Sequence, residues 1–328
     1  MLQRFLVVVL IAMVVIGPLG AANQDNPPAV STAREADARR QLDAIEQELS
    51  EARSLGPAER RARELRFERN LERAVDQAKA TKHANKACYL LAAWRMAYAD
   101  GAGVPDLLDR IDTSGYPAYQ QAAKQLRVRW LLRRGRPAEA RALANELVAT
   151  VPEFASLLDL CTFHEQIGAA APRTAGEPLA GAPADPATRP EPWLVYHFTP
   201  GFTGDDGWLV QQWLDELARP EYAGKARLVC VVAAANPLTA AAELRALPGA
   251  AGVDLLWANP AVDGDAQSWQ AAWKLPDLPA TVLLGPQRTI LAAQPVPADL
   301  RVLVGIAKPT PAATPASGGR GGRPGWSK

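Results

Sequence analysis

The sequence has few of the residues that carry redox, metal and disulfide chemistry. It holds three cysteines and three histidines in 328 residues, and no cysteine lies between Cys161 and Cys230. An odd, low cysteine count excludes a disulfide framework. Excess charge is also absent, since 36 basic and 35 acidic side chains leave a net charge of +1. We therefore predict no nucleic-acid partner, and no motif predicts a cofactor.

The N-terminus carries one apolar segment. Residues 5–16 are apolar without interruption, Gly17-Pro18 then breaks the run, and residues 20–22 are small. These features are typical of a secretory signal peptide, so residues 1–22 predict a periplasmic or secreted protein. The alternative is an uncleaved membrane anchor, because the run approaches the minimum for a span. Membrane contact is expected only in that case, and no cysteine follows that would accept a lipid.

Residues 23–171 are predicted to form an all-α domain. Leu42, Ile45 and Leu49 recur at helical spacing on an Arg- and Glu-rich background. The charges of residues 32–80 mix both signs, which indicates a solvated face with i,i+4 pairs. An alternative role for these charged helices is assembly with a partner helix.

One helical pair in this region resembles a tetratricopeptide repeat. Gly135 stands at the inter-helix turn, Ala140 follows five residues later, and Pro152 follows after twelve more. Lys124 and Val128 occupy positions where the repeat usually has Trp and Gly. The resemblance implies binding of protein or peptide, and an ordinary helical bundle is the alternative.

Two segments are rich in Pro, Gly and Ala and lack periodicity. Residues 172–192 are predicted to be a semi-extended linker. Residues 308–328 are predicted to be a disordered, solvated tail.

Residues 193–307 alternate between strand and helix patterns. Apolar, β-branched runs at 193–198 and 227–232 predict buried strands, and 280–284 with 289–291 predict a hairpin across Gly285-Pro286. Such alternation predicts an α/β domain whose central sheet is covered by helices on both faces. The fold class is therefore multidomain: an all-α domain, then an α/β domain.

This second region resembles the thioredoxin superfamily, in its secreted TlpA/ResA-like branch. The pattern is carried by residues 278–284, LPATVLL, and Pro279 falls at the family's cis-proline. Active relatives open their first helix with Cys-x-x-Cys, where the helix N-terminus makes a reactive thiolate. The aligned residues here are Gly204, Asp205, Asp206 and Gly207. The resemblance thus implies the fold and excludes dithiol chemistry at the usual place.

The aligned loop and the proline define a candidate ligand groove. In active relatives these elements hold extended polypeptide, so the resemblance implies a peptide ligand here. Asp205 and Asp206 at a helix start are explained by N-capping and dipole compensation. The alternative is a catalytic or metal-binding carboxylate pair. The groove candidates are Gly204, Asp205, Asp206, Gly207, Leu278 and Pro279.

The remaining cysteines and histidines are interpreted as structural. Cys88 and Cys230 fall on apolar elements and are predicted to be inert core residues. Cys161 and His164 have the spacing of a metal-ligand pair, but no second pair completes a site, which favours a core cysteine beside a surface histidine. His197, on an apolar strand, is predicted to be a core histidine and not a general base.

Together these features predict an exported, non-enzymatic thioredoxin-fold protein that binds a protein or peptide. Two alternatives stay open. One is an enzyme or metal-binding protein that uses Asp205 and Asp206. The other is a structural or assembly protein that acts through its N-terminal helices.

Overall fold

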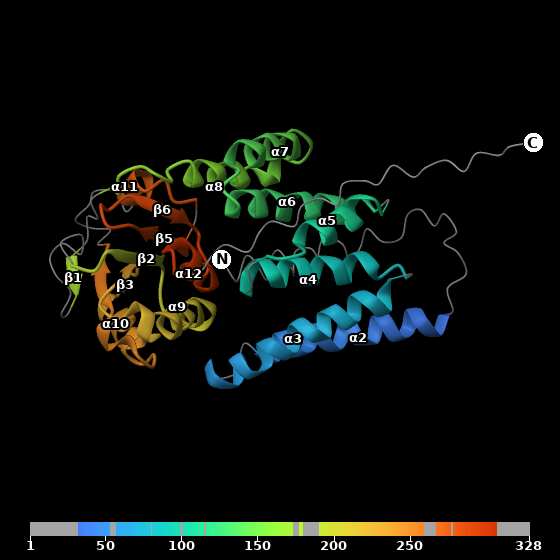
Figure 1. The fold of residues 1–328 in the computed structure, drawn as a ribbon, viewed down its shortest axis with the longest axis horizontal. Coiled ribbons are helices and arrows are strands. Elements are labelled where there is room, and N and C mark those ends of the chain that lie inside the picture. Colours follow the sequence, from blue (N-terminus) through green and yellow to red (C-terminus); the bar gives the residue numbers. More distant parts are fainter. Residues whose placement is uncertain are drawn as a thin grey trace, which may run out of the picture.

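A helical half precedes a half built on a mixed sheet, as predicted (Figure 1). The computed structural model describes residues 32–52, 57–79, 81–98, 101–114, 116–172, 177–179, 190–258, 267–276 and 278–306. The predicted signal peptide, most of the predicted linker and the predicted tail lie outside these ranges. Among the described helices, none has the length and apolar character needed to cross a bilayer.

The first four described helices pack side by side in chain order. Their apolar stripes meet in one cluster, in which Leu42, Phe67, Leu71 and Leu108 are almost fully buried. The four helices are α2 (Thr32–Ala52), α3 (Pro57–Ala78), α4 (Ala84–Tyr98) and α5 (Val104–Asp112).

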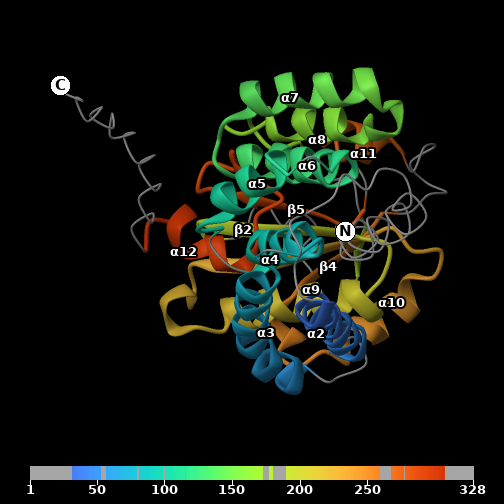
Figure 2. The same ribbon diagram turned by 90° about the vertical axis from the view of Figure 1, so that its right-hand side faces the viewer.

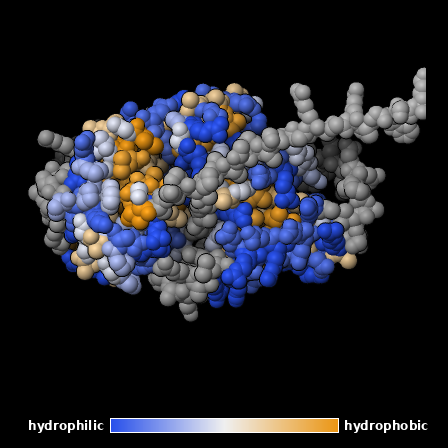
Figure 3. Space-filling view, viewed as in Figure 1, coloured by the Kyte–Doolittle hydropathy of each residue, from blue (hydrophilic) through white to orange (hydrophobic). Residues whose placement is uncertain are grey.

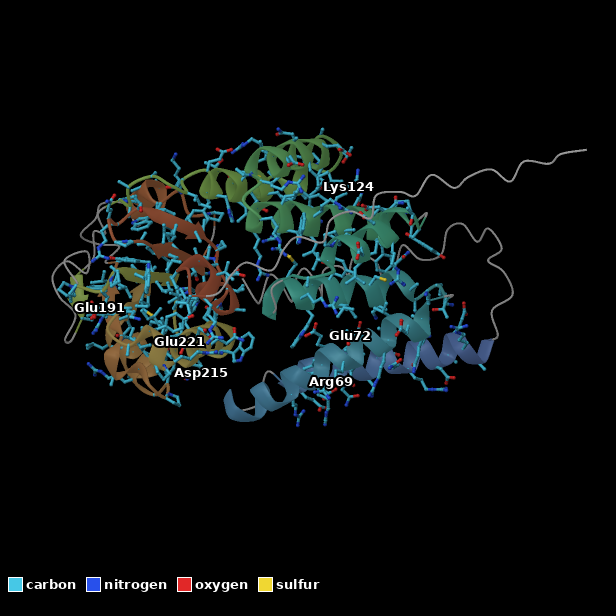
Figure 4. The ribbon with its side chains drawn as sticks, in the orientation of Figure 1. Arg69, Glu72, Lys124, Glu191, Asp215 and Glu221 are labelled. Carbon is cyan, nitrogen blue, oxygen red and sulfur yellow. The ribbon has the colours of Figure 1, made fainter. Side chains whose placement is uncertain are left out.

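Charged side chains join neighbouring helices at the surface. Arg95 of α4 donates to Glu68 at 3.0 Å and to Glu72 at 2.6 Å, both on α3. Figure 4 shows Glu72 and Arg69 on the same helix, at the lower side of the molecule. Within α2, Arg39 pairs with Asp43 at i,i+4 spacing, as the charge pattern predicts.

The next three helices are α6 (Pro117–Arg133), α7 (Pro137–Thr150) and α8 (Ser156–His164). Gly135 turns the chain between α6 and α7 with φ +69°, a conformation that favours glycine. Ala140 is fully buried, and Pro152 begins a 3₁₀ turn after α7. α6 packs against both α4 and α8. The tetratricopeptide-like character of this pair stays a prediction.

Six strands form one sheet in the order β1-β4-β3-β2-β5-β6. The central strands β2, β3 and β4 are parallel, while β1, β5 and β6 are antiparallel to their neighbours. α9 (Gly204–Leu217) and α10 (Pro237–Arg245) make the crossovers between the parallel strands. The strands are β1 (Glu177–Leu179), β2 (Trp193–Thr199), β3 (Ala226–Val232), β4 (Asp254–Trp257), β5 (Ala280–Leu284) and β6 (Ile290–Ala293).

Helices cover both faces of this sheet (Figure 2). Successive side chains of a strand point to opposite faces. Val195 of β2 therefore joins an apolar cluster with α9, α10 and α12 (Leu300–Leu303). Tyr196 and Phe198 join a second cluster on the other face, together with Trp273, which follows α11 (Gln267–Ala272).

That second cluster also contains the apolar residues of α6, α7 and α8. Helices α6 to α8 and the sheet thus share one core. Polar interactions also join these helices to the sheet domain. Arg133 of α6 forms a bidentate pair with Asp299, with N–O distances of 3.0 and 2.5 Å. Gln166, just after α8, donates to the carbonyl of Trp273 at 2.8 Å.

Part of the predicted linker is a strand. Glu177–Leu179 forms β1 and pairs antiparallel with β4 at one sheet edge. Just before the linker, Ala170 bridges to Thr289 beside β6. The chain therefore contacts both edges of the sheet around residues 170–179, which a free tether would not do. The predicted domain boundaries themselves stay a prediction.

Candidate functional site

The candidate groove lies at the edge where the parallel strands end. Phe198, near the end of β2, pairs with Ala280, so Pro279 lies beside Thr199. The Thr199 carbonyl accepts from the amide of Ala233, just past the end of β3, at 2.9 Å. The carboxyl ends of β2 and β3, the start of α9 and the start of β5 therefore meet at one edge. In open α/β sheets this edge is the usual place for a ligand.

The proline at this edge is cis. Among the described residues, the peptide bond between Leu278 and Pro279 is cis. The sequence resemblance places a cis-proline at this position. Pro279 is buried, while Leu278 is partly buried and packs against the core shared by the sheet and the helices. Leu278 thus offers an apolar surface at the edge.

The residues that the resemblance aligns with a Cys-x-x-Cys pair form the first turn of α9. The helix begins at Gly204, whose φ is +58°, and Thr203 precedes it as N-cap without a side-chain cap bond. Asp205 and Asp206 are therefore the second and third helical residues, and the N-cap position itself belongs to Thr203. Dipole compensation still applies to carboxylates in a first turn. Asp206 is partly buried and has an interaction partner.

The loop before α9 is fixed from two sides. The Thr199 hydroxyl donates to the carbonyl of Gly201 at 2.5 Å, and the amide of Phe202 donates to Glu243 of α10 at 3.2 Å. Gly207 packs so closely on this loop that a Cβ would lie 2.0 Å from the Phe202 carbonyl oxygen. Sequence reasoning singled out neither Thr199 nor Glu243, because both act on residues that the fold brings near.

His197 lies in the core beneath this edge, as predicted. It is fully buried on the central strand β2, and its Nδ1 lies 3.0 Å from the hydroxyl of Thr281, while Nε2 has no hydrogen-bond partner. Burial lowers its pKa to about 3. A neutral imidazole without solvent access cannot exchange protons with a substrate at the groove.

The thiols are also removed from the groove. Cys88, Cys161 and Cys230 are buried and free. Burial raises the pKa of each thiol, and most strongly that of Cys230 on β3. Because the thiolate is the nucleophile, such thiols are inert.

His164 is buried and not at the surface, which corrects the sequence interpretation. Only 6% of it is exposed, and its Nδ1 has no hydrogen-bond partner. Burial is the main cause that lowers its pKa to about 4, and the neighbouring Arg129 adds to the effect. Within the described ranges, no group of three or more metal-ligating side chains is present at His164 or elsewhere.

Because these two histidines are buried in the neutral form, we expect the free energy of unfolding to fall on mild acidification. The folded pKa of His197, about 3, lies below the unfolded value near 6.5. Its contribution is therefore complete above about pH 6.5 and is lost as pH falls toward 3. Between pH 6 and 5 we expect His197 to add a slope of roughly 1 kcal/mol per pH unit, measured by urea unfolding.

His197→Gln should remove that slope, because glutamine does not titrate. In the unaltered protein, the ring protons of His197 should keep their NMR shifts down to pH 4.5. A titration with a midpoint near pH 6.5 would contradict the described burial.

The order of elements and the cis-proline together define a thioredoxin-like fold. No protein-family model matches the chain, and no curated protein matches it. A similar solved structure is the thioredoxin domain of a thiol-disulfide oxidoreductase from Bacteroides vulgatus. It is 15% identical with a TM-score of 0.35, over 43% of this chain and 96% of that one. Another is a thioredoxin-like protein from Bacteroides caccae, 11% identical with a TM-score of 0.35, over 87% of this chain and 99% of that one.

Identities and TM-scores this low do not assign a family. The thioredoxin-like character of the chain therefore rests on its own strand order, its crossover helices and the cis bond before Pro279.

Proposed function

We propose that this chain is an exported, non-enzymatic thioredoxin-fold protein that binds a peptide or protein partner. One observation carries the proposal: Gly-Asp-Asp-Gly opens α9 where relatives have two thiols, while the cis-proline is kept at the same sheet edge. The fold around the reactive position is retained without the reactive groups, which favours binding over chemistry.

The edge offers what an extended polypeptide needs. Leu278 provides a partly exposed apolar surface, and the first turn of α9 provides backbone N–H groups that no helical carbonyl accepts. Recognition of extended peptides combines main-chain hydrogen bonds with shallow pockets for side chains. We also propose that the chain belongs to the TlpA/ResA-like branch and that the α6–α7 pair is a tetratricopeptide-like repeat. Residues 1–22 are proposed to direct its export.

A peptide-library screen followed by fluorescence anisotropy tests the binding. Leu278→Arg should weaken the affinity for a selected peptide at least tenfold, because it places a charge on the apolar edge. Arg69→Ala on the exposed face of α3 is the matched control and should leave affinity unchanged. Equal affinity of the Leu278 variant, with an unchanged circular dichroism spectrum, would reject the groove.

The absence of dithiol chemistry is tested separately. Reduction of insulin by this protein with a thiol reductant should not exceed the rate of the reductant alone, because the three thiols are buried. Turnover that disappears in a Cys230→Ser variant would refute the non-enzymatic part of the proposal.

A further inference from the structure

Leu238 is the most exposed large apolar side chain in the described part of the chain, at 75%. It is the second residue of α10, which begins shortly after β3 ends, so it stands at the sheet edge where the candidate groove lies. Figure 3 shows a mostly hydrophilic surface on which apolar side chains gather in a few patches. One exposed leucine needs no explanation by itself, but this one stands at the edge proposed for the peptide.

Strand pairing places a partly buried tryptophan at the same edge. Thr199, Val232 and Trp257 pair in one row across β2, β3 and β4, and Pro279 lies beside Thr199 at the start of β5. The indole N–H of Trp257 donates to the carbonyl of Ala234 at 3.0 Å. Because Ala234 belongs to the loop that leads into α10, this hydrogen bond holds the indole beside the start of that helix.

The row has a length that a short extended peptide spans. Pro279 and Trp257 stand on β5 and β4, with β2 and β3 between them. Neighbouring strands lie about 4.8 Å apart, so three strand spacings separate these residues by roughly 14 Å along the edge. An extended chain rises about 3.4 Å per residue, so about four residues cover the same distance. Side chains four residues apart in such a chain point to the same side.

The two loops between these ends are uncharged and offer main-chain donors. Residues 199–201 are Thr-Pro-Gly, and residues 233–237 are Ala-Ala-Ala-Asn-Pro. Among the residues that the structure describes, no acceptor is present for the amides of Ala234 and Ala235. Extended peptides are recognised by main-chain hydrogen bonds together with contacts to alternate side chains. A peptide with neutral residues between two apolar ones therefore matches this edge.

We propose that the ligand is an extended peptide with two apolar side chains four residues apart and uncharged residues between them. One apolar side chain packs on Leu278, and the other packs on Trp257 and Leu238 at the far end of the row. This inference rests on the proposed peptide-binding function and adds the class of peptide. Leu238 is a specificity-determining residue for the second apolar side chain only.

Fluorescence anisotropy with designed peptides tests the spacing. The probes are labelled ten-residue peptides of serine and threonine that carry two leucines at spacings from i,i+2 to i,i+6, and one peptide with a single leucine. The i,i+4 peptide should bind the full chain at least fivefold more tightly than the i,i+3, i,i+5 and single-leucine peptides. Equal affinity at every spacing would overturn the inference.

A serine variant of Leu238 tests the second contact. Leu238→Ser should weaken binding of the i,i+4 peptide about tenfold and change that of the single-leucine peptide less than twofold. Ile167→Ser is the matched control, because Ile167 is 43% exposed and the next amide, of Gly168, donates to Ile290 at the opposite end of the sheet. Affinity for the i,i+4 peptide should be unchanged in this control. Equal weakening by both variants, or by neither, would overturn the inference.

The outcomes separate this inference from the function on which it rests. Peptide binding that Leu278→Arg weakens but that shows neither a spacing preference nor an effect of Leu238→Ser would overturn the inference alone. No binding of any designed or library peptide would reject the proposed function with it. Sedimentation tests a second copy of the chain as the occupant: a dimer that Leu238→Ser dissociates would also overturn the peptide assignment.

Discussion

Replacing Trp273 with alanine should lower the free energy of unfolding by about 3–5 kcal/mol, the cost of removing a large buried aromatic side chain. The indole is fully buried and stacks on Tyr196, with ring centroids 5.5 Å apart. It also contacts Phe198, with centroids 5.1 Å apart. The cavity would open in the core that the sheet shares with α6, α7 and α8, where neighbours on both sides limit collapse.

Guanidinium unfolding followed by circular dichroism measures this loss. Because the core is shared, α6 to α8 and the sheet should unfold in one transition, and Trp273→Ala should lower the midpoint of that transition. Trp273→Phe keeps an aromatic ring in the cavity and should cost less than half as much. A loss below about 1 kcal/mol for the alanine variant would show that the indole is not packed as described.

Gly207→Ala should destabilise the protein by about 3 kcal/mol or prevent folding, although it adds a single methyl group. The new Cβ would lie 2.0 Å from the carbonyl oxygen of Phe202 and 2.9 Å from its carbonyl carbon. Both are backbone atoms, and the Phe202 amide is tied to Glu243, so the loop cannot move away cheaply. Overpacking against a fixed backbone usually costs 1–3 kcal/mol, and this approach is closer than most.

Gly252→Ala is the matched control for that substitution. A Cβ at Gly252 would meet nothing within 4 Å, and the residue does not require a positive φ. Its effect on stability should stay within about 0.5 kcal/mol. If both variants unfold at the same denaturant concentration, α9 does not approach the loop as closely as described.

The helices and strands of this chain were predictable because each produces a local pattern of apolar and turn residues in the sequence. The apolar run 193–198 predicts β2, and the run 280–284 with its Gly-Pro turn predicts the hairpin. The resemblance of residues 278–284 to the thioredoxin superfamily implied the cis bond before Pro279. These features depend on neighbours within a few residues, so the sequence alone contains the information.

The first turn of α9 was predicted only in part. The sequence predicted a helix start around Asp205 and Asp206, and the helix begins at Gly204. In this first turn Gly207 approaches Phe202 closely, and that approach depends on the loop geometry that Thr199 and Glu243 fix. A glycine in a sequence does not reveal which atoms approach it.

The sequence by itself determined the order of helices and strands, the place of the cis-proline and the absence of thiols at the start of α9. The tertiary structure alone decided that α6, α7 and α8 share a core with the sheet and that His164 is buried. The physical reason is the range of the interactions: periodicity reports which side of an element is apolar, but not which distant element covers it. Burial and pairing of a charged or titratable side chain depend on that distant partner.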